Sequence, residues 1–273
     1  MIGARRLVSV ATLVTFHAHL DDECIACGGV MRKAFEEGHR VVLVVATRGE
    51  HGEVPPGFLA DGEPLWRRRV EETEAAAEIL GAKRLEFLGY TDSGMMGTPE
   101  NDLPGSFWRA PVEEAAAKLA AILREERADV LTVYDDYGTY GHPDHIQVHR
   151  VGMRAAELAG TPRVYQSTVN TDHMRAGLAE FAAKAAESGI EIPAVDGLDQ
   201  LGKPAAEITA AVDVTPWLEV KRAAMRAHAS QISEQSMFLA MPGDAFAHAF
   251  GTEWFIRAGQ GPGITETDLM AGL

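Results

Sequence analysis

The sequence predicts an α/β fold: a Rossmann-like, mostly parallel sheet with helices on both faces, followed by a C-terminal elaboration. Two observations lead to this prediction. The strand-like runs are continuously apolar instead of alternating, as expected of strands buried on both faces. These runs also alternate with amphipathic helical segments through the first two thirds of the chain, and that rhythm is typical of parallel sheets. No G-x-G-x-x-G follows the first run, which disfavours a dinucleotide-binding module.

The predicted elements of this core follow one another closely. Gly38 and Gly81 each end a predicted helix, and Pro64 lies near the start of one. The expected strands span residues 7–16, 41–47, 84–89 and 129–135. The expected helices span residues 23–37, 64–80, 111–126 and 143–159.

The N-terminal segment "MIGARRLVSVATLVTF" imitates a signal peptide, with basic residues ahead of an apolar run. The same run is rich in β-branched residues and leads directly into a polar cluster that begins at His19. We therefore expect a buried strand here.

The pattern is less regular after residue 170. Helices are expected over 174–188 and 216–232, and strands over 205–214 and 253–257. Because no repeat or low-complexity linker interrupts the chain, we predict a single α/β domain over 1–273, with a core of 7–170 and an elaboration of 171–273.

Composition excludes several functions. The 273 residues include 25 Lys and Arg against 40 Asp and Glu, a formal net charge of −15. Nucleic acids and anionic membranes both require clustered basic charge, so neither is an expected partner. Two cysteines cannot form a disulfide framework, which favours a cytoplasmic location. No apolar run approaches the roughly 18 residues of a transmembrane segment.

Two polar clusters follow predicted strands and carry the chemistry. In "HAHLDDE", His19 and Asp22 are close enough to face one ion, while Asp21 between them is free for another task. A catalytic zinc takes three His or carboxylate ligands and keeps one position for water. The later cluster "GHPDHIQVH" offers histidines, and ligands gather at the carboxyl ends of parallel strands. One of those histidines would complete a His-Asp-His site.

The C-x-x-C of Cys24 and Cys27 suggests a rival zinc or redox site. A zinc ribbon needs a second pair of ligands of this kind, and the chain has no other cysteine. The surrounding "CIACGGVM" is small and apolar, so we expect both thiols to pack within a helix behind the acidic turn.

The motifs "AHLDDE" (18–23) and "GHPDH" (141–145) resemble those of the zinc-dependent de-N-acetylases related to N-acetylglucosaminyl-phosphatidylinositol and mycothiol-pathway deacetylases, the LmbE-like family. The first motif of that family reads A-H-P-D-D-E, so Leu20 stands where the family has proline. The resemblance continues through "TRGEHGEV" and "FLGYTDSGM" and covers most of residues 10–150.

The resemblance implies a role for each matching residue. The zinc ligands would be His19, Asp22 and His145. Asp21 would act as the general base, and a protonated His142 would stabilise the oxyanion and protonate the leaving amine.

Further roles follow from the same match. Asp144 would orient a histidine, as carboxylates behind metal ligands do, and Tyr140 would reach the oxyanion. Arg69, Asp92 and Glu53 match positions that touch the sugar. For Arg69 an alternative is a solvated helix face, because "WRRRVEE" places glutamates nearby.

Other residues near the motifs are given supporting roles. Glu23 is expected to fix the backbone of the motif or a ligand histidine. His51, His149 and His228 are expected at the surface or behind the ligands.

The implied activity is removal of an N-acyl group, acetyl or longer, from an N-acylglucosamine-type sugar in a glycoconjugate. An alternative is an amidase acting on mycothiol S-conjugates. A metal-binding regulatory protein is disfavoured because Asp21 and His142 are both present. Zn²⁺ is the expected cofactor, and Fe²⁺ can occupy similar ligands. The apolar loops 53–66, 92–111 and 236–246 either pack on the protein or form a hydrophobic entrance for an aglycone or acyl chain.

Overall fold

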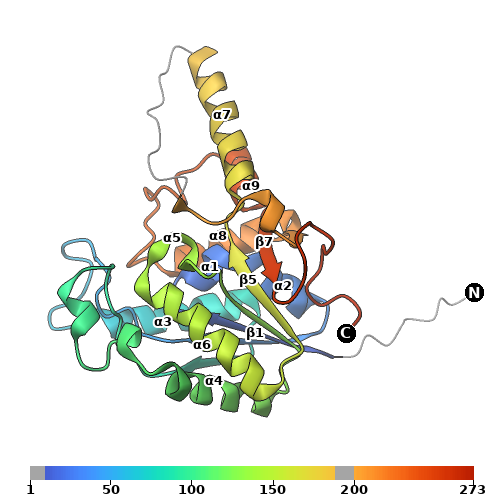
Figure 1. The fold of residues 1–273 in the computed structure, drawn as a ribbon. Coiled ribbons are helices and arrows are strands. Elements are labelled where there is room, and N and C mark those ends of the chain that lie inside the picture. Colours follow the sequence, from blue (N-terminus) through green and yellow to red (C-terminus); the bar gives the residue numbers. More distant parts are fainter. Residues whose placement is uncertain (1–9, 188–199) are drawn as a thin grey trace, which may run out of the picture.

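A seven-stranded sheet organises the fold in the computed structural model, which describes residues 10–187 and 200–273 (Figure 1). The strand order is β3-β2-β1-β4-β5-β7-β6. The strands are β1 (Thr12–His17), β2 (Arg40–Val45), β3 (Arg84–Phe87), β4 (Val130–Tyr134), β5 (Arg163–Thr168), β6 (Ala210–Asp213) and β7 (Thr252–Arg257).

The first five strands run parallel, and β7 pairs antiparallel with both β5 and β6. The predicted mostly parallel α/β fold is therefore confirmed. From β1 the chain adds β2 and β3 on one side, and then returns to add β4 and β5 on the other. The carboxyl ends of β1 and β4 consequently flank the point where the strand order reverses, where ligands bind in such sheets.

Helices cover both faces of the sheet (Figure 1). Alternate strand residues face opposite ways, so Leu13 joins one apolar core layer and Val14 the other. The first layer packs against α1 (Asp22–Ala26), α2 (Gly28–Glu36), α3 (Leu65–Leu80) and α8 (Leu218–Ala227). The second packs against α4 (Val112–Glu126) and α6 (Pro143–Ala159). The remaining helices are α5 (Gly138–Gly141), α7 (Thr171–Glu187), which projects from the rest of the fold, and α9 (Gly243–Phe250).

Several predicted elements differ from the observed ones. The expected helix 23–37 breaks at Cys27, whose φ of −135° is not helical. The start of α2 approaches Val214, the residue after β6, so closely that a Cβ on Gly29 would lie 2.3 Å from it. The expected helix 216–232 ends at Ala227, and β6 occupies only the end of the expected strand 205–214.

The short helix α5 was not predicted, and neither were β5 and α9. Strand β5 has the partly polar sequence RVYQST and intermediate burial at two positions, so it lacks the continuous apolar run of the central strands. Helix α9 begins within the stretch 236–246 that was interpreted as a loop. The expected strand residues 7–9 and the end of the expected helix at 188 lie outside the described residues.

The C-terminal elaboration is joined to the core through the buried carboxylate of Glu253. Lys221 Nζ lies 2.6 Å from Glu253 Oε1, and both side chains are almost fully buried. The same carboxylate accepts the backbone N–H groups of Gly29 and Val30 at 2.8 and 2.9 Å, at the N-terminus of α2. These contacts, with the strands that β6 and β7 add to the sheet, support the proposal of one domain.

Candidate active site

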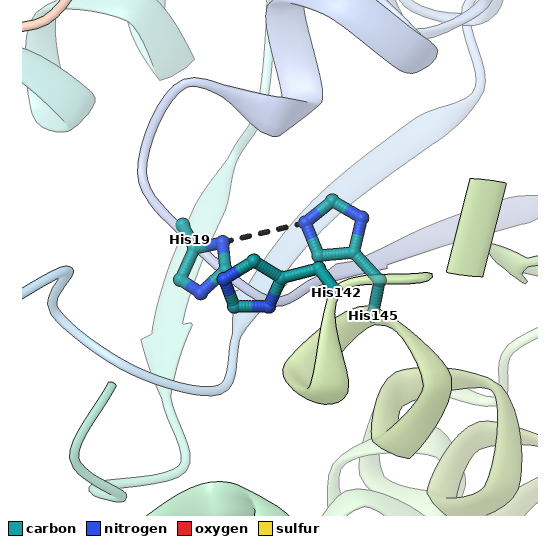
Figure 2. Close-up of side chains that lie close together, drawn as sticks. All are labelled: His19, His142 and His145. Carbon is teal, nitrogen blue, oxygen red and sulfur yellow. Dashed lines mark hydrogen bonds between the residues drawn. The ribbon is translucent and has the colours of Figure 1, made fainter. Parts of the chain in front are cut away.

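The two polar clusters meet at the reversal point of the sheet. His19 lies in the loop after β1, whereas His142 and His145 lie at the start of α6, after β4 (Figure 2). All three side chains are buried. His19 and His145 are 126 residues apart in sequence and yet lie 3.3 Å apart, Nδ1 to Nε2. The expected convergence of the two motifs at one edge of the sheet is therefore observed.

The start of α6 is fixed by its own sequence. His142 is the N-cap, and its Nδ1 accepts the backbone N–H of Asp144 at 3.1 Å. Pro143 follows at the first helical position, where the missing N–H has no cost. This first turn therefore presents His142, Asp144 and His145 toward the loop after β1. Because Nδ1 of His142 is an acceptor, its ring proton is assigned to Nε2.

Three ligand atoms form a nearly equilateral triangle. Nδ1 of His19 lies 3.4 Å from Oδ2 of Asp22, and Nε2 of His145 lies 3.3 Å from the same oxygen. The two nitrogens are 3.3 Å apart. Ligand atoms at about 2.0–2.1 Å from a tetrahedral zinc lie about 3.3–3.4 Å from one another. The donor types and separations thus fit a tetrahedral metal ion with one position left for water or substrate.

Side chains behind this triangle set its orientation. Nε2 of His19 lies 3.2 Å from Oδ2 of Asp144, which also accepts the backbone N–H of Ser93 at 2.9 Å. His145 stacks on Tyr134 with ring centroids 4.2 Å apart. Desolvation opposes charge on His19, but Asp92 and Asp144 prevail and raise the pKa of His19 well above its ordinary value. The histidine that Asp144 contacts is therefore His19.

Asp21 lies beside the triangle and has an unusual backbone. Its φ is 122°, a conformation that L residues rarely adopt. Its Oδ2 lies 3.5 Å from the guanidinium of Arg69. Burial raises the pKa of Asp21 to about 6, with the neighbouring Asp22 adding to the rise and Arg69 opposing it. A carboxylate whose pKa lies near neutrality is suited to accept and release a proton.

His142 and Tyr140 line the same cluster. The ring of His142 lies 4.5 Å from that of His19 and 5.1 Å from that of His145, centroid to centroid. Burial and these two neighbouring histidines lower the pKa of His142 to about 3. Tyr140 is 44% exposed, and its ring lies 5.0 Å from that of His145. These surroundings favour a neutral ring over the expected protonated His142.

The expected sugar-binding residues lie in different surroundings. Arg69 is 3% exposed and donates to the carbonyls of Gly49 and Leu20 at 3.0 and 2.5 Å, so the alternative of a solvated helix face is wrong. Asp92 is buried with Oδ1 3.6 Å from Nε2 of His19. Glu53 is exposed, and its backbone carbonyl accepts a hydrogen bond from a glutamine of the C-terminal region.

The two cysteines and Leu20 behave as core residues. Cys24 and Cys27 are free thiols with no exposed surface, within the first core layer. Burial raises the pKa of Cys24 well above its ordinary value, which makes its thiol unreactive. Leu20 is also fully buried in that layer. Replacement of the family proline by Leu20 is therefore accommodated by packing.

Sequence reasoning missed some residues of the site. Tyr134 ends β4, and its hydroxyl lies 2.9 Å from Nδ1 of the buried His17. Ser93 acts through its backbone, which no side-chain pattern reveals. A signal existed for Tyr134 only, which lies near the end of the predicted strand 129–135 that leads into the second motif. His228 was expected at the surface or behind the ligands, and it is fully buried against Glu23.

The apolar loops were expected either to pack on the protein or to form a hydrophobic entrance, and different residues fit each interpretation. Phe107 is fully buried, with its ring 6.3 Å from that of Phe16, so this part of 92–111 packs on the protein. Met95, Met96 and Met237 are instead exposed by half or more. Neither interpretation describes these loops as a whole.

A triangle of potential metal ligands with an adjacent titratable carboxylate, at the reversal point of a parallel sheet, is the arrangement expected of a metal-dependent hydrolase on an α/β scaffold. Residues 14–156 match the family model of PIG-L, described as GlcNAc-PI de-N-acetylase. The chain belongs to the PIG-L family. The predicted kind of enzyme, an amide hydrolase of the deacetylase type, is thereby confirmed.

The similarity to known deacetylases extends over the full chain. A 1D-myo-inositol 2-acetamido-2-deoxy-alpha-D-glucopyranoside deacetylase of Streptomyces griseus is 41% identical, over 100% of this chain and 90% of that protein. A protein of the same name from Geodermatophilus obscurus is 40% identical, over 100% of this chain and 99% of that protein. A crystallised deacetylase of the teicoplanin pathway shares the fold, with a TM-score of 0.61, 17% identity and coverage of 92% and 100%. Within residues 10–187 and 200–273, no helix has the length and hydropathy needed to cross a membrane.

Proposed function

We propose that this enzyme removes the acetyl group from the glucosamine nitrogen of 1D-myo-inositol 2-acetamido-2-deoxy-α-D-glucopyranoside, with Zn²⁺ as cofactor. The 41% identity to the Streptomyces griseus deacetylase, over the whole chain, supports this substrate. The observation that carries the proposal is the triangle of His19, Asp22 and His145 beside Asp21.

Zinc would be held by Nδ1 of His19, Oδ2 of Asp22 and Nε2 of His145. Bound zinc lowers the pKa of water to about 7 and polarises an amide carbonyl, which supplies the nucleophile and the electrophile of amide hydrolysis. Asp144 keeps the proton of His19 on Nε2, so that Nδ1 presents its lone pair to the metal.

Asp21 is the general base in this proposal. Its carboxylate accepts the proton of the attacking water and then delivers it to the departing nitrogen, so that one residue serves both transfers. A pKa of about 6 suits both tasks at neutral pH. Arg69, 3.5 Å away, keeps the carboxylate in place and opposes its protonation before substrate binds.

His142 stabilises the oxygen of the scissile carbonyl as negative charge develops on it. Its neutral ring donates from Nε2, because Nδ1 is occupied by the backbone N–H of Asp144. Tyr140 adds a second donor on the exposed side of the site. Asp92 accepts from hydroxyl groups of the sugar, and we assign Arg69 and Glu53 to substrate binding as well.

The test is product analysis with the zinc-loaded protein. We expect acetate and the free amine of the glucosaminyl inositol from the acetylated substrate, and at most slow release of a mercapturate-type fragment from a mycothiol S-conjugate. Preferential cleavage of the S-conjugate would replace the proposal with the amidase alternative. A longer acyl chain or aglycone turned over faster than the acetyl substrate would instead support the hydrophobic entrance.

A further inference from the structure

A buried pair of side chains, Glu23 and His228, lies behind Asp21 and has no part in the proposed chemistry. Oε1 of Glu23 lies 2.5 Å from Nε2 of His228, and both side chains are 0% exposed. The two residues are 205 positions apart in the chain, one in α1 and the other just after α8. Since neither side chain is exposed to solvent, each serves as a hydrogen-bond partner of the other.

The other carboxylate oxygen of Glu23 holds the backbone of Asp21. The N–H of Asp21 donates to Oε2 of Glu23 at 3.0 Å. The carbonyl of Asp21 accepts from the backbone N–H and the Sγ of Cys24, at 3.2 and 2.8 Å. Both sides of this peptide segment are therefore fixed by hydrogen bonds.

These hydrogen bonds hold the backbone of Asp21 in a conformation that is otherwise unfavourable. Asp21 has φ 122° and ψ −26°, and backbone strain of this kind costs on the order of 1–3 kcal/mol. Such strain persists only where the surroundings determine it. The positive φ of Asp21 sets the direction of its Cα–Cβ bond, and hence the position of its carboxylate next to Arg69.

The position of His228 is itself determined by its neighbours. Ser230 donates to Glu72 on α3 through its backbone N–H and its hydroxyl, at 2.9 and 2.7 Å. The carbonyl of His228 accepts the backbone N–H groups of Gln231 and Ile232. The segment that follows α8 is thus attached to α3 and presents His228 to Glu23.

We propose that Glu23 and His228 are positioning residues for Asp21: they lock its backbone in the positive-φ conformation that places the carboxylate for proton transfer. The inference rests on the proposed role of Asp21 as general base. Asp22 has an anchor of its own, since its Oδ2 accepts the backbone N–H of His19 at 2.9 Å. Metal binding therefore does not depend on the pair.

The test compares His228→Gln with His228→Asn. The longer amide of glutamine reaches the place of Nε2 and donates to Glu23, whereas that of asparagine corresponds to Nδ1 and falls short. We expect the asparagine variant to lose about tenfold or more in kcat relative to the glutamine variant. KM should stay within about twofold, and both variants should bind one zinc per chain.

Two further measurements separate positioning from stability. Lys221→Met removes another buried charge from α8, one that contacts Glu253 instead of Glu23. It should lower Tm and leave the kcat of the folded protein unchanged. In an Asp21→Asn background, His228→Gln and His228→Asn should have equal residual rates, because the group that they position is gone.

Equal kcat for the two zinc-loaded His228 variants would overturn the inference. So would a loss of the same size in the Asp21→Asn background, or loss of zinc from His228→Asn with no change in kcat per bound zinc. If wild-type protein loaded with zinc does not release acetate, the proposed function fails instead, which is a different result.

Discussion

The two ends of the parallel sheet hold partly buried carboxylates in opposite surroundings. At the amino ends of β2 and β3, Glu126 pairs with Arg40 at 2.5 and 3.0 Å and with Arg84 at 2.8 Å. These arginines lower the pKa of Glu126 to about 2. At the carboxyl end, burial raises the pKa of Asp21 to about 6. At the amino ends the carboxylate is paired with arginines, whereas at the carboxyl end Asp21 can take up a proton near neutral pH.

The paired charges at the amino end contribute to stability, whereas the carboxylate at the carboxyl end serves the proposed function. Matched ion pairs lower the free energy of the folded state, whereas crowded carboxylates and a strained backbone raise it unless a ligand compensates. Substitutions at the carboxyl end should therefore remove activity at little cost in stability. Substitutions at the amino end should do the reverse.

The largest effect is expected for Asp21→Asn. Loss of the proton acceptor should reduce kcat by about 10²–10⁴-fold while zinc stays bound, because asparagine keeps the shape of the side chain. Steady-state kinetics with zinc analysis of the same sample measure both quantities. A rate near that of the wild type would mean that another group takes the proton.

The next effect concerns the orientation of His19. Asp144→Asn places an N–H donor where Nε2 of His19 now donates, which favours the wrong tautomer for metal binding at Nδ1. We expect zinc affinity to fall by about 10–100-fold, measured by competition with a chelator. Asp92→Asn, whose oxygen lies further from the same nitrogen at 3.6 Å, is the matched control with a smaller effect. Equal affinities in all three proteins would refute the role of Asp144.

At the opposite end, Glu126→Gln should reduce the free energy of unfolding by about 2 kcal/mol after allowance for solvent screening. Its folded-state pKa lies below the ordinary value of 4.5, so this stabilisation is present above about pH 4.5 and is lost as the pH falls toward 2. Urea titrations at pH 7 and pH 2 should show the full wild-type advantage at pH 7 and little of it at pH 2. A change in kcat would contradict the claim that the amino end of the sheet affects stability and leaves activity unchanged.

The smallest effect tests the strain itself. Asp21→Gly should stabilise the metal-free protein by about 1 kcal/mol, because glycine adopts positive φ without a steric cost. Arg127→Gly, at the left-handed C-cap of α4 with φ 49°, should give a similar gain at the amino end and keep full activity. Denaturant unfolding of both variants checks this. Destabilisation by Asp21→Gly would show that its carboxylate contributes more than its backbone costs.

The sequence predicted what depends on local pattern and strand order. The buried strands, the edge at which His19 and His145 meet, and the packing of Cys24 and Cys27 all follow from apolar runs and short spacings. Gly81 was expected to end a helix, and it does end α3, in a left-handed conformation with φ 86°.

What the sequence could not predict depends on contacts between distant segments. The partly polar β5 is a strand because β4 and β7 pair with it, and its own pattern does not reveal this. His228 lies 205 residues from Glu23, and nothing in either motif indicates that they meet. The lowered pKa of His142 comes from burial and from the neighbouring His19 and His145, and His19 belongs to a distant motif.

Zinc titration of the metal-free protein tests the central claim most directly. The claim is that adjacent aspartates have different tasks: Asp22 holds the metal, and Asp21 moves the proton. Calorimetric titration of wild type, Asp21→Asn and Asp22→Asn should give one tight site in the first two proteins. In Asp22→Asn, binding should be at least about 100-fold weaker, because one of the three protein ligands is lost. Tight binding by Asp22→Asn, or its loss in Asp21→Asn, would contradict the account.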